Sequence, residues 1–133
     1  MYMKRYLLSF VLFLFAFHNY AQTKKVYYLN QKLDSKFSKE IVLTKILEDS
    51  RCPEGVQCIW AGEIRFEVAA YQNKKLVEQL EFNYNNKTEE EIRNWFEKNL
   101  PKRNKQLKHV LILPRPKDGK QSKFSEYYIK LEY

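Results

Sequence analysis

Short runs in which apolar and polar residues alternate dominate the chain. Residues 63–68 alternate between charged and apolar side chains, and residues 76–84 place their large apolar side chains on one face. A period of two residues is typical of a strand with one buried face. Because only residues 72–74 separate the two runs, we expect a β-hairpin, although the Asn-Gly sequence that favours tight turns is missing.

Four further segments have the composition of strands. Residues 41–47 are mostly apolar and β-branched, and residues 26–29 form a shorter run of the same kind. Residues 107–113 are apolar and are closed by a Pro-Arg-Pro sequence. Residues 127–133 alternate between aliphatic or aromatic and polar positions up to the last residue. These patterns predict strands, with the proline-rich sequence marking an end.

One segment, residues 88–100, has the period of a helix instead. Apolar side chains recur at spacings of three and four residues until Pro101, which cannot continue a helix. Thr88 and Glu91 have the spacing of a capping box, in which each side chain bonds the backbone amide of the other residue. Three consecutive glutamates in the first turn would stabilise the helix, because their negative charges lie near the positive end of its dipole.

Together these elements predict a mainly β fold: a β-sandwich or open barrel of five to six strands with one packed helix. Residues 22–133 contain no internal repeat and no low-complexity linker. A chain of about this length buries roughly two-thirds of its surface on folding, enough for one core. We therefore expect a single domain.

The first residues of the chain have the pattern of a secretory signal. Lys4 and Arg5 precede an apolar run at residues 7–17, and a polar stretch then ends near Ala21. The apolar run is shorter than the roughly 20 residues that span a bilayer. We predict a signal peptide at residues 1–21, with an uncleaved anchor as the alternative. After cleavage the protein would be periplasmic or secreted and would not span the membrane.

Both cysteines, Cys52 and Cys58, lie in one short loop that also contains Pro53 and Gly55. In an oxidising compartment such a pair is most simply a disulfide that closes a tight loop. A redox-active pair and a metal site are the alternatives. The spacing is not the C-x-x-C of redox proteins, and two thiolates without a neighbouring histidine make an incomplete metal site. The sequence thus favours a disulfide-stapled domain with no metal and no cofactor.

The sequence around the cysteines resembles the DSRCPxxVxCxWAG motif of small exported bacterial proteins common in Bacteroidota, here at residues 49–62. The C-terminal part is similar as well, with Pro-x-Pro at residues 114–116 and a Tyr-x-Ile-x-Leu strand at residues 127–131. The resemblance covers residues 33–71 and 107–133. It implies a compact exported β domain and assigns no activity, ligand or catalytic residue.

The favoured functional hypothesis is an exported, non-enzymatic binding or interaction module. A disulfide loop is a rigid element that a domain can present at its surface. Arg51, Glu54 and Trp60 lie in or next to this loop. We expect these three residues to engage a protein partner, because aromatic residues and arginine are enriched at interfaces.

A second hypothesis rests on charge. The chain has a formal net charge of +8, and residues 98–123 carry nine basic side chains against Asp118 alone. Lys102, Arg103 and Lys105 form the candidate patch for a polyanion such as lipopolysaccharide, an acidic glycan or extracellular DNA. The alternative is a solvated surface. Specific nucleic-acid recognition is not expected, because few aromatic residues are interleaved for base stacking.

Nothing in the sequence indicates a catalytic site. The histidine at position 109 lies inside a predicted strand, which favours a structural or surface role over that of a general base. Ser122 and Ser125 have no partner pattern for a nucleophile, and no glycine-rich phosphate loop is present. An unrecognised hydrolase remains the third hypothesis.

Overall fold

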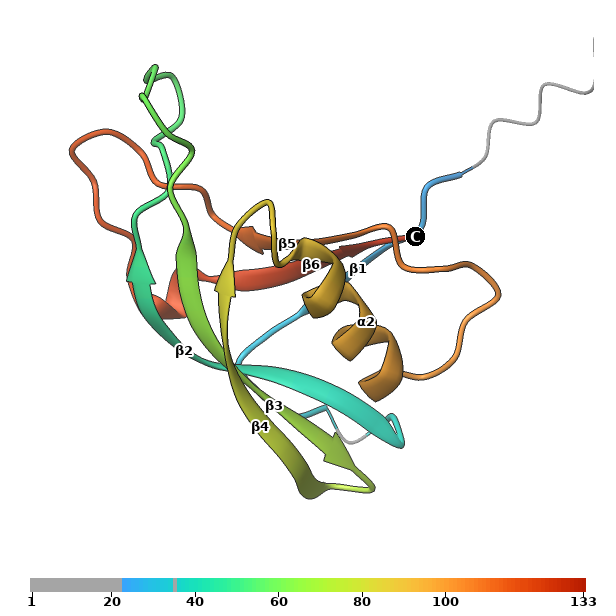
Figure 1. Ribbon diagram of the computed structural model, residues 1–133. Helices are drawn as coiled ribbons and strands as arrows, with labels where there is room; N and C mark the ends of the chain where they lie inside the picture. Colours follow the sequence, from blue (N-terminus) through green and yellow to red (C-terminus); the bar gives the residue numbers. More distant parts are fainter. Residues whose placement is uncertain (1–22, 35) are drawn as a thin grey trace, which may run out of the picture.

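The computed structural model describes residues 23–34 and 36–133, so the predicted signal peptide lies outside the described residues. The described strands form two antiparallel sheets of three strands each. One sheet has the order β1 (Val26–Leu29), β6 (Tyr128–Glu132), β5 (His109–Leu113). The other has the order β2 (Lys39–Asp49), β3 (Ile64–Gln72), β4 (Lys75–Tyr84). Figure 1 shows the two sheets with the helix α2 (Glu89–Asn99) beside them.

The predicted hairpin is confirmed as β3 and β4. Gln72 pairs with Lys75, so Asn73 and Lys74 make a two-residue turn. Both turn residues have positive φ values, 50° and 66°. Two consecutive left-handed residues match the right-handed twist of the flanking strands. Asn73 adopts this conformation readily, and the hairpin therefore forms without glycine.

The predicted helix is also confirmed, and its buried residues are Ile92, Trp95 and Phe96. The predicted capping box is wrong, because Thr88 makes no side-chain hydrogen bond to the helix amides. Its hydroxyl instead accepts a hydrogen bond from the amide of Asn85 at 3.0 Å and donates to the carbonyl of Asn83 at 2.6 Å. The side chain thus closes the turn between β4 and α2.

A single hydrophobic core joins the two sheets and the helix. Its fully buried side chains come from all three: Phe66 from β3, Phe96 from α2 and Ile129 from β6. Leu107, in the loop before β5, is buried as well. The helix packs against β2, β4 and β5. The predicted class, mainly β with one packed helix, is therefore confirmed, and the two sheets have the layered packing of a sandwich.

Strands β2 and β3 continue past the core into a protruding loop. The register of β2 against β3 shifts between Leu43 and Lys45 and again between Ile46 and Glu48. Such bulges bend a strand and increase its twist. The bend carries the chain outward into residues 50–63, which we call the finger and which project beyond both sheets (Figure 1).

Candidate functional site

A disulfide between Cys52 and Cys58 closes the tip of the finger, as predicted. The two Cα atoms are 5.9 Å apart, within the usual range for disulfides. Below this bond the two sides of the finger pair through the backbone. The amide of Cys52 donates to the carbonyl of Ala61 at 3.0 Å, and that of Ser50 donates to Glu63 at 2.9 Å. The finger is therefore a closed, hydrogen-bonded structure.

Gly62 allows the two sides of the finger to approach closely at its base. Its φ of 71° lies in the left-handed region. A Cβ atom at this position would collide with the backbone carbonyl of Ser50. Only glycine satisfies both the conformation and the space. Gly55, at the tip, also has positive φ, but a Cβ atom there would meet no other atom within 4 Å.

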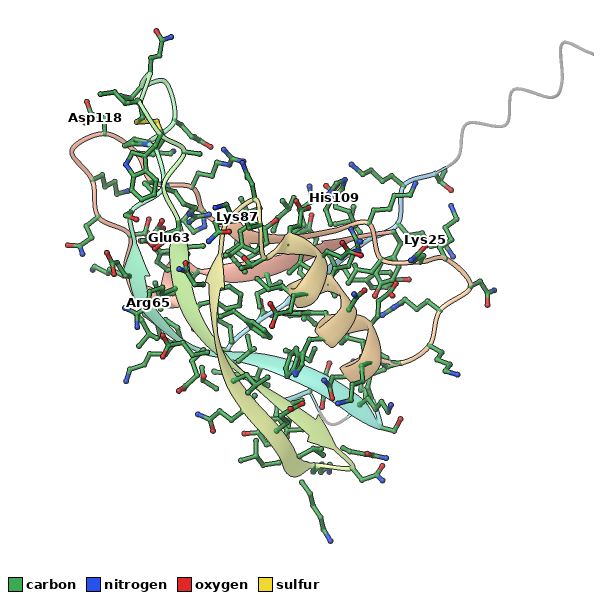
Figure 2. The ribbon with its side chains drawn as sticks, in the orientation of Figure 1. Lys25, Glu63, Arg65, Lys87, His109 and Asp118 are labelled. Atoms are coloured by element: carbon green, nitrogen blue, oxygen red, sulfur yellow. A yellow bond between two sulfur atoms is a disulfide. The ribbon has the colours of Figure 1, made fainter. Side chains whose placement is uncertain are left out.

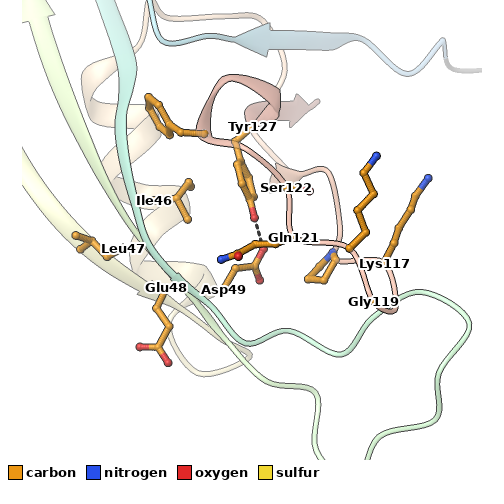
Figure 3. A pocket seen from close by; sticks show the side chains of 12 residues that line it. Ile46, Leu47, Glu48, Asp49, Lys117, Gly119, Gln121, Ser122 and Tyr127 are labelled. Atoms are coloured by element: carbon orange, nitrogen blue, oxygen red, sulfur yellow. Dashed lines mark hydrogen bonds between the residues drawn. The ribbon is translucent and has the colours of Figure 1, made fainter.

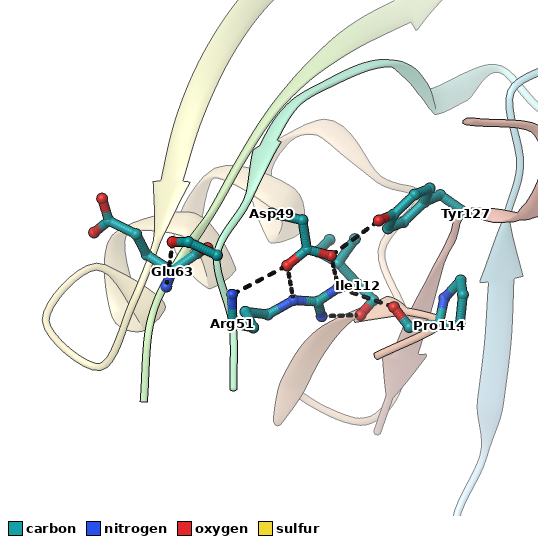
Figure 4. Close-up of polar contacts among 7 residues, drawn as sticks. Asp49, Arg51, Glu63, Ile112, Pro114 and Tyr127 are labelled. Atoms are coloured by element: carbon teal, nitrogen blue, oxygen red, sulfur yellow. Dashed lines mark hydrogen bonds and ion pairs between the residues drawn. The ribbon is translucent and has the colours of Figure 1, made fainter. Parts of the chain in front are cut away.

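A largely buried ion pair between Asp49 and Arg51 fixes the finger to the sheet that contains β5 (Figure 4). Arg51 Nε and Nη2 donate to the two carboxylate oxygens at 2.7 and 2.6 Å. Nη1 donates to the carbonyl of Ile112 at 2.6 Å, and Nη2 donates to that of Pro114 at 2.9 Å. We call these contacts the Asp49–Arg51 clamp. They connect the end of β2 to the end of β5.

Tyr127 completes the clamp, because its hydroxyl donates to Asp49 Oδ2 at 3.0 Å. Burial raises the pKa of Tyr127, and the hydrogen bond to Asp49 adds to this effect. The backbone amide of Arg51 also donates to Asp49 Oδ1 at 3.3 Å. The carboxylate thus accepts four hydrogen bonds, which fix its position at the base of the finger.

The structure separates the three loop residues that the sequence indicated for binding. Arg51 lies at the base of the finger, where its side chain is only 15% exposed. Glu54 lies at the tip and Trp60 on the side of the finger, and both are exposed, Trp60 to 64%. Val56 and Ile59 are exposed as well, and Ile59 has no neighbour that covers it. The finger therefore presents three apolar side chains to solvent.

A second loop supports the finger from the side. The amide of Glu54 donates to the carbonyl of Pro116 at 2.9 Å, and Glu54 forms an isolated parallel bridge with Lys117. Asp118 follows in the same loop, next to the finger in Figure 2. The disulfide closes the finger internally, while the Asp49–Arg51 clamp and this bridge both fix it to the end of β5 and the loop that follows.

A cavity of about 460 Å³ lies between the end of β2 and the loop that leads to β6 (Figure 3). Ile46, Phe124 and Tyr127 provide apolar walls, while Glu48 and Lys120 provide opposite charges. The volume is in the range of small-molecule sites. The Asp49 carboxylate, which also lines the cavity, already accepts four hydrogen bonds from Arg51 and Tyr127.

The basic segment, residues 98–123, is divided between opposite ends of the molecule (Figure 1). Lys117 and Lys120 lie beside the finger, at the cavity described above. Lys102, Arg103 and Lys105 lie at the far end, in the loop between α2 and β5. The structure thus brings the three predicted polyanion residues together and separates them from Lys117 and Lys120.

The single histidine outside the predicted signal peptide, His109, begins β5 and contacts the start of α2. His109 Nδ1 lies 3.2 Å from Glu89 Oε1, and both side chains are substantially exposed. Burial raises the pKa of the neighbouring Tyr84 to about 12, with Glu89 as the next cause. A surface histidine paired with one carboxylate is consistent with a structural contact.

The sequence did not reveal the Asp49–Arg51 clamp, although the two residues are close along the chain. Their partners are two backbone carbonyls at the end of β5 and a tyrosine just before β6, all more than 60 residues away in the sequence. Within residues 23–34 and 36–133, no group of three or more histidine, cysteine, aspartate or glutamate side chains could hold a metal ion. No helix in this part of the chain is long and apolar enough to cross a membrane.

Comparison of the chain with protein-family models, curated protein sequences and solved structures finds no match in any of the three.

Proposed function

We propose that this protein is an exported interaction module that binds a protein partner through the tip of its finger. One observation carries the proposal: Val56, Ile59 and Trp60 are exposed together on a segment that is fixed at its base. Single exposed apolar residues are common on protein surfaces. Three of them on one projecting loop form a contact surface that water disfavours and a partner can cover.

The rigidity of the finger supports this proposal energetically. Binding costs free energy when a loop must be ordered, and a loop that is already ordered avoids that cost. The disulfide, the close approach at Gly62 and the Asp49–Arg51 clamp all constrain the finger before any partner arrives. Arg51 therefore contributes to the function by positioning the tip, while Trp60 and Ile59 make the contact.

Export is part of the proposal and rests on the predicted signal peptide together with the disulfide. Disulfides persist in oxidising compartments and are rare in the bacterial cytosol. Cys52 and Cys58 are both engaged in one bond, so no free thiol is left among the described residues. This pairing fits a periplasmic or secreted protein.

Site-specific photo-crosslinking tests the proposal directly. A photoreactive phenylalanine analogue is placed at Ile59, and as a control at Leu76, which is also an exposed apolar residue but lies on β4. In cells that produce the protein naturally, the Ile59 position should give a discrete covalent adduct that the Leu76 position does not give. Identical adduct patterns from the two positions would contradict the proposal.

A further inference from the structure

A cluster of four cations at the end of the molecule opposite the finger is independent of the proposed function. It comprises Lys25, just before β1, and Lys102, Arg103 and Lys105, in the loop after α2. Figure 2 shows Lys25 at the far side from Asp118 and the finger. Two cavities of about 360 and 220 Å³ lie at this cluster, and both are lined by Arg103, Lys105 and Tyr133. We call the two cavities together the basic cleft.

Arg103 is held in a fixed orientation at the centre of the basic cleft. Its Cζ atom lies 3.5 Å from the centroid of the Tyr27 ring and 5.2 Å from that of Tyr133. The two rings pack edge to face, with centroids 5.5 Å apart. A guanidinium that stacks on an aromatic ring keeps its N–H groups in one plane, ready for a planar or tetrahedral anion. The two tyrosines thus preorganise the arginine.

Among the described residues, the cations of the basic cleft have no ion-pair partner, because no carboxylate lies within 4 Å of the charged groups of Lys25, Lys102, Arg103 or Lys105. Arg103 Nε is buried and makes no hydrogen bond to any described residue. Glu97, the acidic residue that lines the cleft, already accepts a hydrogen bond from the amide of Leu107 at 2.7 Å. The protein encloses Nε, so an external anion would be bound by the Nη groups of Arg103 and by the lysines around them.

We propose that the basic cleft binds the sulfate and carboxylate groups of an acidic polysaccharide, with Arg103 as the central contact and Lys25 and Lys105 on either side. An arginine recognises such groups through two parallel hydrogen bonds. Lys25 lines one cavity, Lys102 lines the other and Lys105 lines both, and cations spread in this way match a polymer that repeats its charge along its length.

The aromatic residues of the basic cleft distinguish this ligand from nucleic acid. Single-stranded nucleic acids bind proteins by stacking their bases on exposed aromatic faces. Here Arg103 covers the ring face of Tyr27, and Tyr133 is only 5% exposed. The two rings that hold Arg103 are therefore largely occupied by the arginine and by the core, and a DNA oligonucleotide in the test below decides between the two ligand classes.

The test measures the affinity of the protein, expressed from its full sequence and purified in its disulfide-bonded form, for a heparin oligosaccharide of defined length. Neutral dextran and a single-stranded DNA oligonucleotide are measured in parallel over a range of salt concentrations. The protein should bind heparin with a strong salt dependence and should not bind dextran. Lys25→Gln with Lys105→Gln should weaken heparin binding about tenfold or more and flatten its salt dependence.

Lys45→Gln with Lys75→Gln is the matched control, because both lysines are exposed on the other sheet and the change in net charge is equal. It should bind heparin almost as well as the parent. Arg103→Lys keeps the charge but loses the planar fork, and should also weaken binding about tenfold. The paired lysine changes keep the test valid if Arg103→Lys proves unstable in a thermal melt.

Three results would overturn the inference. Equal losses from the cleft and control lysine pairs would show that diffuse positive charge attracts heparin. Unchanged binding by a folded Arg103→Lys variant would remove arginine as the central contact. DNA affinity equal to or above that for heparin would refute the proposed ligand class.

Discussion

Replacing Arg51 by alanine should destabilise the domain more than any other single change of a surface-loop residue outside the hydrophobic core. In the folded protein Arg51 makes a two-point ion pair with Asp49 and donates to the carbonyls of Ile112 and Pro114. The change leaves the Asp49 carboxylate, whose side chain is 8% exposed, with the Tyr127 hydroxyl as its remaining side-chain donor. It also leaves two backbone carbonyls without these donors.

Removing one partner of a buried ion pair costs about 3–5 kcal/mol, because the other charge remains desolvated. The clamp keeps some contact with solvent, so we expect a loss of about 3 kcal/mol for Arg51→Ala. This is a large part of the roughly 5–15 kcal/mol that stabilises a typical domain. Equilibrium unfolding in urea, followed by tryptophan fluorescence, measures the change as a shift of the midpoint.

Arg65→Ala is the matched control, because Arg65 also makes a close ion pair, to Glu81 at 2.6 Å, but on an exposed strand surface. Exposed ion pairs contribute little to stability, so its urea midpoint should stay close to that of the parent. An Arg51→Ala midpoint that shifts no further than that of Arg65→Ala would refute the role assigned to the clamp.

Three further predictions test the finger and the edge of the sheet. Gly62→Ala should lower the free energy of unfolding by about 2 kcal/mol or more, because it combines positive φ with a collision at Ser50. Gly55→Ala should lower it less, and equal urea midpoints for the two variants would contradict this. Cys52→Ser should lower stability by about 1–3 kcal/mol and leave a cooperative transition, because the closed loop is short; a non-cooperative melt would contradict this. Hydrogen bonds from two lysines, with their positive charge, hold the pKa of Glu132 at about 2, below its ordinary 4.5. The stability that the ionised Glu132 side chain contributes is therefore fully present above pH 4.5 and is lost as the pH falls toward 2. The melting temperature of Glu132→Gln should fall less than that of the parent over this pH interval.

Local patterns in the sequence were sufficient to predict most of the secondary structure. Alternation predicted β3 and β4, and helical spacing with a terminal proline predicted α2, because both signals depend on residues close together in the chain. The predicted capping box was wrong although its sequence pattern is also local. The Thr88 hydroxyl bonds the backbone of the turn that precedes the helix in place of the helix amides.

The sites depend on contacts that sequence spacing does not encode. The Asp49–Arg51 clamp needs the carbonyls at the end of β5, which reach it because the two sheets meet at the base of the finger. The basic cleft needs Lys25 and Tyr133, which lie at opposite ends of the described chain. They come together because β1 pairs with β6, a long-range pairing with no local signal. The sequence indicated Arg103 and Lys105 but not these partners.

The affinity of the crosslinked partner for finger variants tests the central claim most directly. The partner identified from the Ile59 adduct is purified, and its dissociation constant is measured for the parent, for Trp60→Ser and for Val77→Ser. Val77 is an exposed apolar residue on β4, so it controls for the loss of surface hydrophobicity. A central aromatic contact contributes about 2 kcal/mol or more, so Trp60→Ser should weaken binding about thirtyfold while Val77→Ser leaves it unchanged. Equal dissociation constants for all three proteins would contradict the finger as the binding element.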